Sequence, residues 1–178
     1  MRVVEKLRDK DEGCPWDKEQ THASLKKYLI EESYEALEAI DLEDYESLQE
    51  ELGDVLLQIL LHSTIGKEKG EFNVHEVIKT VAEKMVYRHP HVFKKEETMT
   101  SGEVKDQWEE LKKKEKNEAS LGEALEKISK FNPSLTRAEK IQSKARKYGF
   151  DWEEIDDVFS KLFEEIQELK DAISEKSQ

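Results

Sequence analysis

The chain has 178 residues, of which 40% are charged, and its formal net charge of −13 disfavours nucleic acid or an anionic membrane as a partner, because either would be repelled. Three Pro, seven Gly and apolar residues at helical spacing predict an all-α protein with few long loops. A single cysteine, Cys14, excludes an internal disulfide and, with a charged N-terminus unlike a signal peptide, predicts a cytoplasmic protein.

The first predicted helix covers residues 21–40. Asp17 and Gln20 are spaced like a capping box that would start it. Its buried face is expected to consist of the apolar residues at helical spacing, which are Leu25, Leu29, Ala36 and Ile40. A short polar connection comes after it, in which Asp41 or Asp44 would cap the next helix.

The second predicted helix covers residues 45–65 and is apolar nearly all round after Asp54, which indicates a central buried helix. The two glycines of GKEKGEFN predict a turn after it. The third predicted helix covers residues 74–88 and ends before Pro90, which disfavours a helical conformation at the preceding residue. Its apolar stripe consists of Val74, Val77, Ile78, Val81 and Met85.

A fourth helix is predicted to begin at Thr100, which has the capping-box spacing to Glu103. Four helices with short connections predict a compact antiparallel bundle over residues 1–117. Residues 118–133 mix polar residues with Gly and Pro and are predicted to connect the bundle to a C-terminal helical segment. That segment, residues 134–178, is predicted to form two further helices, the last of them amphipathic.

Carboxylates gather on the first two predicted helices. Glu31, Glu32 and Glu35 lie within an arc of about 100°, and Glu32 borders the apolar stripe, so its carboxylate is expected to point partly into the bundle. Glu51 and Asp54 are three residues apart and share a face of the second helix. A carboxylate in so apolar a run is costly unless it is ion-paired or bound to a metal.

Cationic partners for these carboxylates are absent from the local sequence, because no Lys or Arg occurs between Lys27 and Lys67. A strongly anionic set of oxygen ligands suits a hard cation, Mg²⁺ or alternatively Mn²⁺, and not zinc. The other interpretation is a solvated acidic helix face plus one buried acid. His89 and His91 have no third soft ligand near them in sequence, which disfavours a zinc site there.

Four short blocks occur in an order that resembles the MazG family of nucleoside triphosphate pyrophosphohydrolases. They are CPWDKEQT at 14–21, EESYE at 31–35, EELGD at 50–54 and RHPHVF at 88–93. The similarity covers about residues 10–117, with further likeness to about residue 175. Each acidic motif alone is common, whereas the four blocks in this order are specific.

The resemblance implies an α-helical homodimer that controls nucleotide pools. The implied reaction is Mg²⁺-dependent hydrolysis of an NTP or dNTP between the α and β phosphates, which yields a nucleoside monophosphate and pyrophosphate. By matching position, the implied metal ligands are Glu32, Glu35, Glu51 and Asp54. Glu31 completes the implied catalytic set, either as a ligand or as a carboxylate that orients a water molecule.

Three further residues are candidates for substrate binding by the same resemblance. Lys84 and Arg88, four residues apart on the third predicted helix, match a basic pair of the family that would contact phosphate. Trp108 and the lysines after it would contact the base or the phosphates. From the sequence alone, Lys84 and Arg88 equally suit the negative end of a helix dipole, and Trp108 equally suits a core.

The last predicted helix repeats the acidic spacing of the first in Glu164, Glu165 and Glu168, and it resembles the start of a second, incomplete MazG-like repeat. Lys161 matches a phosphate-contacting lysine of the family's second copy, whereas the first copy here has Tyr28 at that place. This departure supports an alternative function, a non-catalytic module of a longer tandem protein that binds metal or nucleotide or mediates dimerisation.

Overall fold

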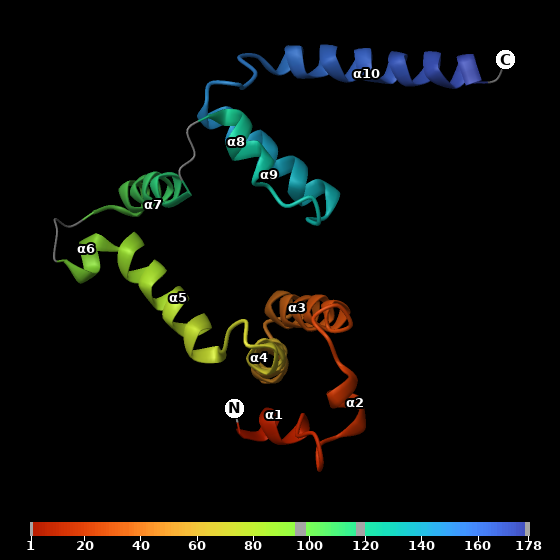
Figure 1. The fold of residues 1–178 in the computed structure, drawn as a ribbon. Coiled ribbons are helices and arrows are strands. Elements are labelled where there is room, and N and C mark those ends of the chain that lie inside the picture. Colours follow the sequence, from red (N-terminus) through yellow and green to blue (C-terminus); the bar gives the residue numbers. More distant parts are fainter. Residues whose placement is uncertain (1, 95–98, 117–119, 177–178) are drawn as a thin grey trace. The chain divides into compact units, whose positions relative to one another are not determined.

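The computed structural model describes residues 2–94, 99–116 and 120–176, and these residues form ten helices and no strand (Figure 1). The helices are α1 (Arg2–Leu7), α2 (Pro15–Glu19), α3 (Lys26–Asp41), α4 (Tyr45–Lys69), α5 (Val74–Arg88), α6 (Pro90–Phe93), α7 (Ser101–Lys116), α8 (Leu121–Glu126), α9 (Ser134–Lys147) and α10 (Ile155–Lys176). The all-α prediction, with additional C-terminal helices, is therefore confirmed. The chain divides into two compact units, Met1–Val104 and Lys105–Gln178.

The first unit is built on a hairpin of α3 and α4, which pack against each other, while α1 packs against α4. A short connection joins the two long helices, and such αα-hairpins place their helices antiparallel. The buried core that joins these elements consists of Val4, Leu25, Leu61 and Ile65. Because Leu61 and Ile65 belong to the C-terminal half of α4, this core leaves the N-terminal half of α4 available for a polar site facing α3.

The start of α3 differs from the prediction. Asp17 and Gln20 do not cap a helix at residue 21, because Pro15 starts the separate short helix α2, in which Asp17 is buried. Thr21 and Ser24 instead exchange hydrogen bonds, each backbone N–H donating to the other residue's hydroxyl at 2.9 and 3.1 Å. The helix proper then begins at Lys26.

The buried face of α3 is partly as predicted. Leu25 and Ala36 are buried and Leu29 is half-buried, whereas Ile40 is 53% exposed and Ala39 is buried in its place. The face of α3 that meets α4 is thus rotated by about one residue near its C-terminus. Small alanines at this contact allow the two helices to approach closely.

Helix α4 begins as predicted, because the Asp44 side chain accepts hydrogen bonds from the backbone N–H groups of Glu46 and Ser47. It ends later, at Gly70, whose φ of 71° is the left-handed conformation that favours glycine. The prediction of burial nearly all round is wrong for one face. Along that face Leu52, Leu56 and Ile59 are 54%, 53% and 40% exposed.

The two glycines within α4 have opposite surroundings. A Cβ at Gly66 would lie 2.9 Å from Phe72, whereas a Cβ at Gly53 would meet nothing within 4 Å. Gly66→Ala is therefore expected to lower the free energy of unfolding by about 1–3 kcal/mol through overpacking. Gly53→Ala on the same helix is the matched control and should raise it by about 0.5–1 kcal/mol. Urea denaturation of the metal-free variants measures both, and equal effects would contradict the tight contact at Gly66.

The third predicted helix is confirmed with its bounds, since α5 runs from Val74 to Arg88. Asn73 and Glu76 form a capping box at its start, and the helix stops at His89 before Pro90. Its apolar stripe is mostly uncovered, because Val77, Ile78 and Val81 are 36%, 57% and 49% exposed. The capping box of Thr100 and Glu103 at the start of α7 is also present.

The second unit contains α8, which lies within the predicted connector 118–133. Ala124 in α8 and Ile128 just after it are buried, and α8 packs against α9. Helix α10 carries a long apolar stripe in which Phe163 and Leu169 are 66% and 63% exposed. Among the described helices, none combines the length and the apolar character needed to cross a membrane.

A buried arginine fastens the N-terminal segment to α4. Arg8 is 9% exposed, and its guanidinium donates to both carboxylate oxygens of Glu68 at 2.8 and 2.7 Å. It also donates to the backbone oxygens of Asp17 and Gln20. The hydrogen bond from Arg8 lowers the pKa of Glu68, as expected for a bidentate ion pair.

A pair of histidines makes a second contact between α4 and the part of the chain that precedes α3. The Nδ1 atoms of His22 and His62 lie 2.8 Å apart, and the two rings are stacked with an interplanar angle of 2°. One proton is shared between these nitrogens, so protonation of both rings removes the hydrogen bond. Burial and then the charge of His22 lower the pKa of His62.

This lowered pKa predicts that acidification weakens the fold through His62. The unfolded chain binds the proton more tightly than the folded protein, so the stabilisation is present above the unfolded-state pKa and is lost as pH falls towards the folded-state value. When the pH is lowered from about 7.5 to about 5.5, the free energy of unfolding should fall more in the wild type than in His62→Gln. Urea denaturation in the presence of chelator measures this difference. The same loss in both proteins would contradict this role, since other titrating groups are common to them.

Candidate metal centre

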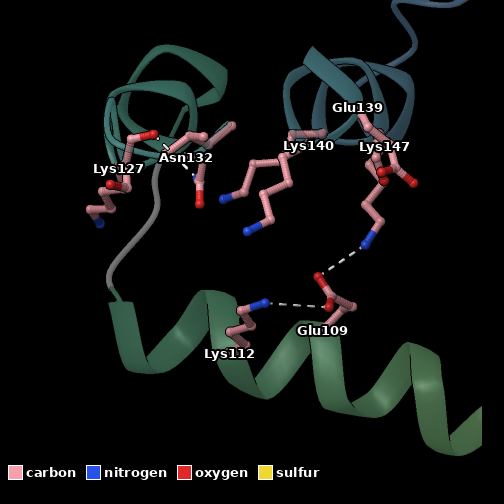
Figure 2. Close-up of a pocket in the computed structure, with 11 residues that line it drawn as sticks. Glu109, Lys112, Lys127, Asn132, Glu139, Lys140 and Lys147 are labelled. Carbon is pink, nitrogen blue, oxygen red and sulfur yellow. Dashed lines mark hydrogen bonds and ion pairs between the residues drawn. The ribbon is translucent and has the colours of Figure 1, made fainter. Parts of the chain in front are cut away.

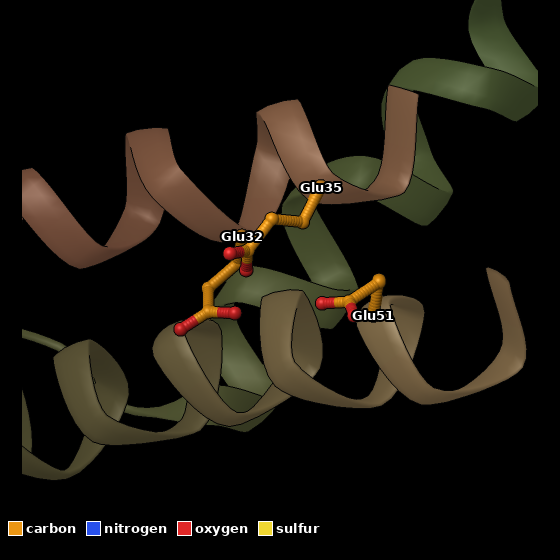
Figure 3. Close-up of side chains that lie close together, drawn as sticks. All are labelled: Glu32, Glu35 and Glu51. Atoms are coloured by element: carbon orange, nitrogen blue, oxygen red, sulfur yellow. The ribbon is translucent and has the colours of Figure 1, made fainter. Parts of the chain in front are cut away.

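Three glutamates from two helices converge in the first unit. Glu32 and Glu35 belong to α3 and Glu51 to α4, and each offers a carboxylate oxygen such that these atoms all lie within 4.8 Å of one another. Figure 3 shows the carboxylates of the two helices pointing toward one another between the ribbons. We refer to Glu32, Glu35 and Glu51 as the acidic cluster.

Local sequence explains why the acidic cluster forms. Glu32 and Glu35 are three residues apart and so share one face of α3. The antiparallel hairpin of α3 and α4 then brings the first turns of α4, including Glu51, beside the middle of α3. Between Lys27 and Lys67 the sequence supplies no Lys or Arg to this contact.

Repulsion between neighbouring carboxylates acts on two members of the acidic cluster, Glu32 and Glu51. Partial burial raises the pKa of Glu32, and the nearby carboxylates of Asp54, Glu35 and Glu51 raise it further. Partial burial likewise raises the pKa of Glu51, together with the charges of Glu35, Asp54 and Glu50. Carboxylates that repel one another in this way are stabilised in their charged form by a cation.

The other predicted acidic residues surround the cluster. Asp54 is half-buried on α4, and its charge acts on both Glu32 and Glu51, although it is not one of the three that lie within 4.8 Å. Glu31 is exposed on α3, one position before Glu32, and Glu38 on the same helix is exposed as well.

The chemistry of the acidic cluster fits a divalent cation. Its donors are all carboxylate oxygens, they come from rigid helices, and they can approach a common point. Hard cations such as Mg²⁺ and Mn²⁺ prefer such ligands, whereas zinc in proteins prefers nitrogen and sulfur. The residues present therefore suit the metal that the sequence predicts.

The predicted phosphate-binding residues differ in their surroundings. Lys84 is half-buried and lines a pocket of about 390 Å³ together with Phe72, Val77 and Val81. Arg88, four residues later on α5, is only 8% exposed. Lys84 is therefore the more accessible of the two. Trp108 lies on α7 in the second unit and is half-buried.

Tyr28, which departs from the family pattern, contributes to packing. It packs against the core, and its ring meets that of Trp16 edge to face with centroids 5.7 Å apart. The Nζ atom of Lys27 lies 4.5 Å from the centre of the Tyr28 ring, so a cation is present beside this position. On α10 Lys161 is ion-paired with Glu164 at 2.7 Å and Glu165 at 3.2 Å.

The sequence interpretation missed one concentration of charged side chains. Five lysines from α7, α9 and the end of α8 line a pocket in the second unit. The density of basic residues in α9, an exception in so acidic a chain, was the available signal. The lysines after Trp108 on α7 were candidates for phosphate contact, but their convergence with lysines of α8 and α9 had no sequence signal, because it depends on how the helices pack.

Comparison with known proteins agrees with the resemblance of the motifs. The MazG nucleotide pyrophosphohydrolase domain matches residues 20–93, a range that includes the acidic cluster and Lys84. The chain is 45% identical to the nucleoside triphosphate pyrophosphohydrolase/pyrophosphatase MazG of Thermotoga maritima over 172 residues, which are 97% of this chain and 65% of that protein.

Two further relatives extend this similarity. The nucleoside triphosphate pyrophosphohydrolase of Escherichia coli K12 is 40% identical over 169 residues, which are 95% of this chain and 64% of that protein. The chain thus spans slightly less than two thirds of the length of both curated relatives. The crystal structure of a mazG-related protein from Thermotoga maritima is similar with a TM-score of 0.53 and 30% identity, over 63% of this chain and 97% of that one.

Proposed function

The chain belongs to the MazG family of nucleotide pyrophosphohydrolases, and from this premise we propose that it hydrolyses nucleoside triphosphates to nucleoside monophosphates and pyrophosphate with Mg²⁺. The observation that carries the proposal is the convergence of Glu32, Glu35 and Glu51 from two helices without a cationic partner nearby in sequence. Relatives named as nucleoside triphosphate pyrophosphohydrolases support the choice of substrate class.

The acidic cluster and Asp54 are the residues that we propose hold the metal. When bound there, Mg²⁺, or Mn²⁺ as the alternative, would neutralise charge on phosphoryl oxygens and make a water molecule more acidic. Glu31 is exposed beside Glu32, and we assign it the orientation of the attacking water. A carboxylate near that water accepts its proton.

Substrate binding is proposed to involve Lys84, Arg88 and Trp108. Lys84 is supported by its place in a pocket of about 390 Å³, whose aromatic and aliphatic lining suits the nucleoside part of a substrate. Arg88 is buried on the same helix. Its proposed role is to hold the end of α5 in place and to add its own positive charge close to Lys84. Trp108 is proposed to contact the base or the phosphates.

A homodimer in the cytoplasm that controls the nucleotide pool completes the proposal. Support for association comes from apolar side chains that are uncovered in the single chain. On α3 and α4 these include Ile30, Tyr34, Leu52 and Leu56, each more than half exposed. Ile30 and Tyr34 are four residues apart on α3, as are Leu52 and Leu56 on α4, so each pair shares a helix face. Exposed apolar surface of this kind favours a protein–protein contact.

The proposed reaction is tested by incubating the protein with a panel of NTPs and dNTPs, with and without Mg²⁺. We expect at least one nucleotide to yield equimolar monophosphate and pyrophosphate, and only with the metal. Nucleoside diphosphate and inorganic phosphate as products would contradict the proposed cleavage position. An absence of turnover with every nucleotide by the metal-loaded protein would contradict the enzymatic function.

A second candidate function is a non-catalytic module that binds metal or nucleotide or mediates dimerisation. The specific observation in its favour is Tyr28, which packs against the core where the family's second copy has a lysine. This function predicts normal nucleotide or metal binding without hydrolysis. The nucleotide panel therefore separates the two functions, because only the enzyme releases pyrophosphate.

A further inference from the structure

A pocket of about 520 Å³ lies within the second unit, between α7, α9 and the end of α8. It shares no residue with the acidic cluster. Its lysines come from three separate segments and are Lys112, Lys127, Lys140, Lys144 and Lys147. Figure 2 shows this arrangement, with α9 facing α7 across the pocket. We refer to it as the lysine pocket.

The lysine pocket is positively charged although the chain is acidic. Its five lysines face two glutamates, Glu109 and Glu139, so the lining has a formal excess of three positive charges, whereas the whole chain has a net charge of −13. Lysines held close together repel one another unless anions are present. Negative charge inside the pocket would therefore reduce the repulsion between these lysines.

The glutamates of the lysine pocket neutralise only some of its lysines. Glu109 pairs with Lys147 at 2.9 Å and with Lys112 at 3.6 Å, so one carboxylate serves two lysines. Lys140 points into the space between α9 and α7 (Figure 2), and within the described residues no carboxylate forms an ion pair with it. The ammonium of Lys140 thus remains available to an anion from solution.

A purely structural explanation accounts for part of this arrangement. Lys144 and Lys147 lie in the last turn of α9, where positive charge stabilises the negative end of the helix dipole. Lys140 lies in the middle of α9 and Lys112 belongs to the facing helix, so neither serves that helix end. The convergence of lysines from separate elements on one cavity points to a ligand.

We propose that the lysine pocket binds a short polyphosphate anion, meaning pyrophosphate or the phosphate chain of a nucleotide, through Lys112, Lys140 and Lys144. Lysine ammonium groups are compact charges that bind phosphate oxygens with charge-assisted hydrogen bonds. The volume lies within the range typical of small-molecule sites. A long polyanion is disfavoured because the chain beyond the pocket is acidic. The proposal does not depend on catalysis at the acidic cluster.

The test is a calorimetric titration of the full chain with pyrophosphate in the presence of chelator. Without divalent ions the acidic cluster repels polyphosphate, so the metal centre does not contribute to the binding that is measured. We expect one saturable site whose affinity falls as the salt concentration rises. The double variant Lys140→Gln/Lys144→Gln should weaken this binding by at least about tenfold.

A control variant of equal charge change keeps the test specific. Lys69→Gln/Lys170→Gln removes two exposed lysines outside the pocket and should leave pyrophosphate affinity unchanged. Equal weakening in both double variants would overturn the proposal, because it would show a general effect of net charge. No saturable binding by the wild type would overturn it as well.

Two further measurements identify the ligand and the site. If the pocket recognises the phosphate chain, tripolyphosphate and a nucleoside triphosphate should bind with similar affinity. Binding of the nucleoside triphosphate without any binding of tripolyphosphate would overturn the proposal that the phosphate chain is recognised. Pyrophosphate should also protect Lys140 and Lys144 from an amine-reactive reagent in the wild type, as read by mass spectrometry. Unprotected lysines at saturating pyrophosphate would overturn the proposed site even if the variants failed to fold.

Discussion

Glu35→Gln is expected to abolish both metal binding and turnover while leaving the fold intact. Glu35 belongs to the acidic cluster, and the substitution keeps the shape of the side chain while it removes the charge. Loss of a residue that only supports a metal ligand lowers metal affinity or activity by up to about 100-fold. Loss of a direct ligand such as Glu35 should therefore lower them by at least about 100-fold. Pyrophosphate release and Mg²⁺ titration measure the two effects.

Glu38→Gln is the matched control, since Glu38 is on the same helix but exposed and outside the acidic cluster. It should retain Mg²⁺ affinity and turnover within a factor of about two. If both variants behaved alike, the acidic cluster would not be the metal site. If neither the wild type nor Glu35→Gln turned over any nucleotide, the non-catalytic module would be the better account of this chain.

Mg²⁺ or Mn²⁺ at millimolar concentration is expected to raise the melting temperature. An ion that binds only the folded protein stabilises it by about 2.7 kcal/mol when its concentration is 100 times its dissociation constant. For a chain of this size that corresponds to a rise of about 5–10 °C. Differential scanning calorimetry with metal and with chelator measures the difference, and equal melting temperatures at pH 8 would argue against the site.

The rise should be larger at pH 8 than at pH 5. The pKa values of Glu32 and Glu51 are raised in the folded protein, so the folded state binds protons more tightly than the unfolded chain. The free energy of unfolding of the metal-free protein therefore falls as pH rises from the ordinary glutamate pKa through the raised values. At pH 5 protons also compete with the metal for these carboxylates.

Asp54→Asn should remove most of this metal response and should raise the stability of the metal-free protein, because the charge of Asp54 contributes to the repulsion at Glu32 and Glu51. Asp11→Asn makes the same chemical change at an exposed position outside the acidic cluster and serves as the control. An unaltered metal response in Asp54→Asn would show that this residue is not part of the site.

Features that depend on neighbouring residues in the chain could be predicted from the sequence. The bounds of α5 follow from the Asn73 cap and from Pro90, and the start of α4 follows from the Asp44 cap. The acidic cluster was likewise foreseeable, because Glu32 and Glu35 share a helix face and a short connection folds α4 back onto α3. Local spacing therefore predicted the residues of the candidate metal centre.

Features that depend on tertiary packing could not be predicted. Whether Ala39 or Ile40 faces α4 is decided by a small rotation of the helix contact, and both positions suit an apolar stripe. The exposed face of α4 at Leu52 and Leu56 looked buried because apolar character alone does not say which element covers it. The lysine pocket was missed for the same reason, since Lys112 and Lys140 are far apart in sequence and meet only through helix packing.

The most direct test of the metal centre is anomalous diffraction from crystals of the protein grown with Mn²⁺. We expect an anomalous peak between α3 and α4, coordinated by Glu32, Glu35 and Glu51, and its disappearance in crystals of Glu35→Gln. A peak that is absent from this position in the wild type, with Mn²⁺ bound instead only at Glu164, Glu165 and Glu168 of α10, would contradict the account.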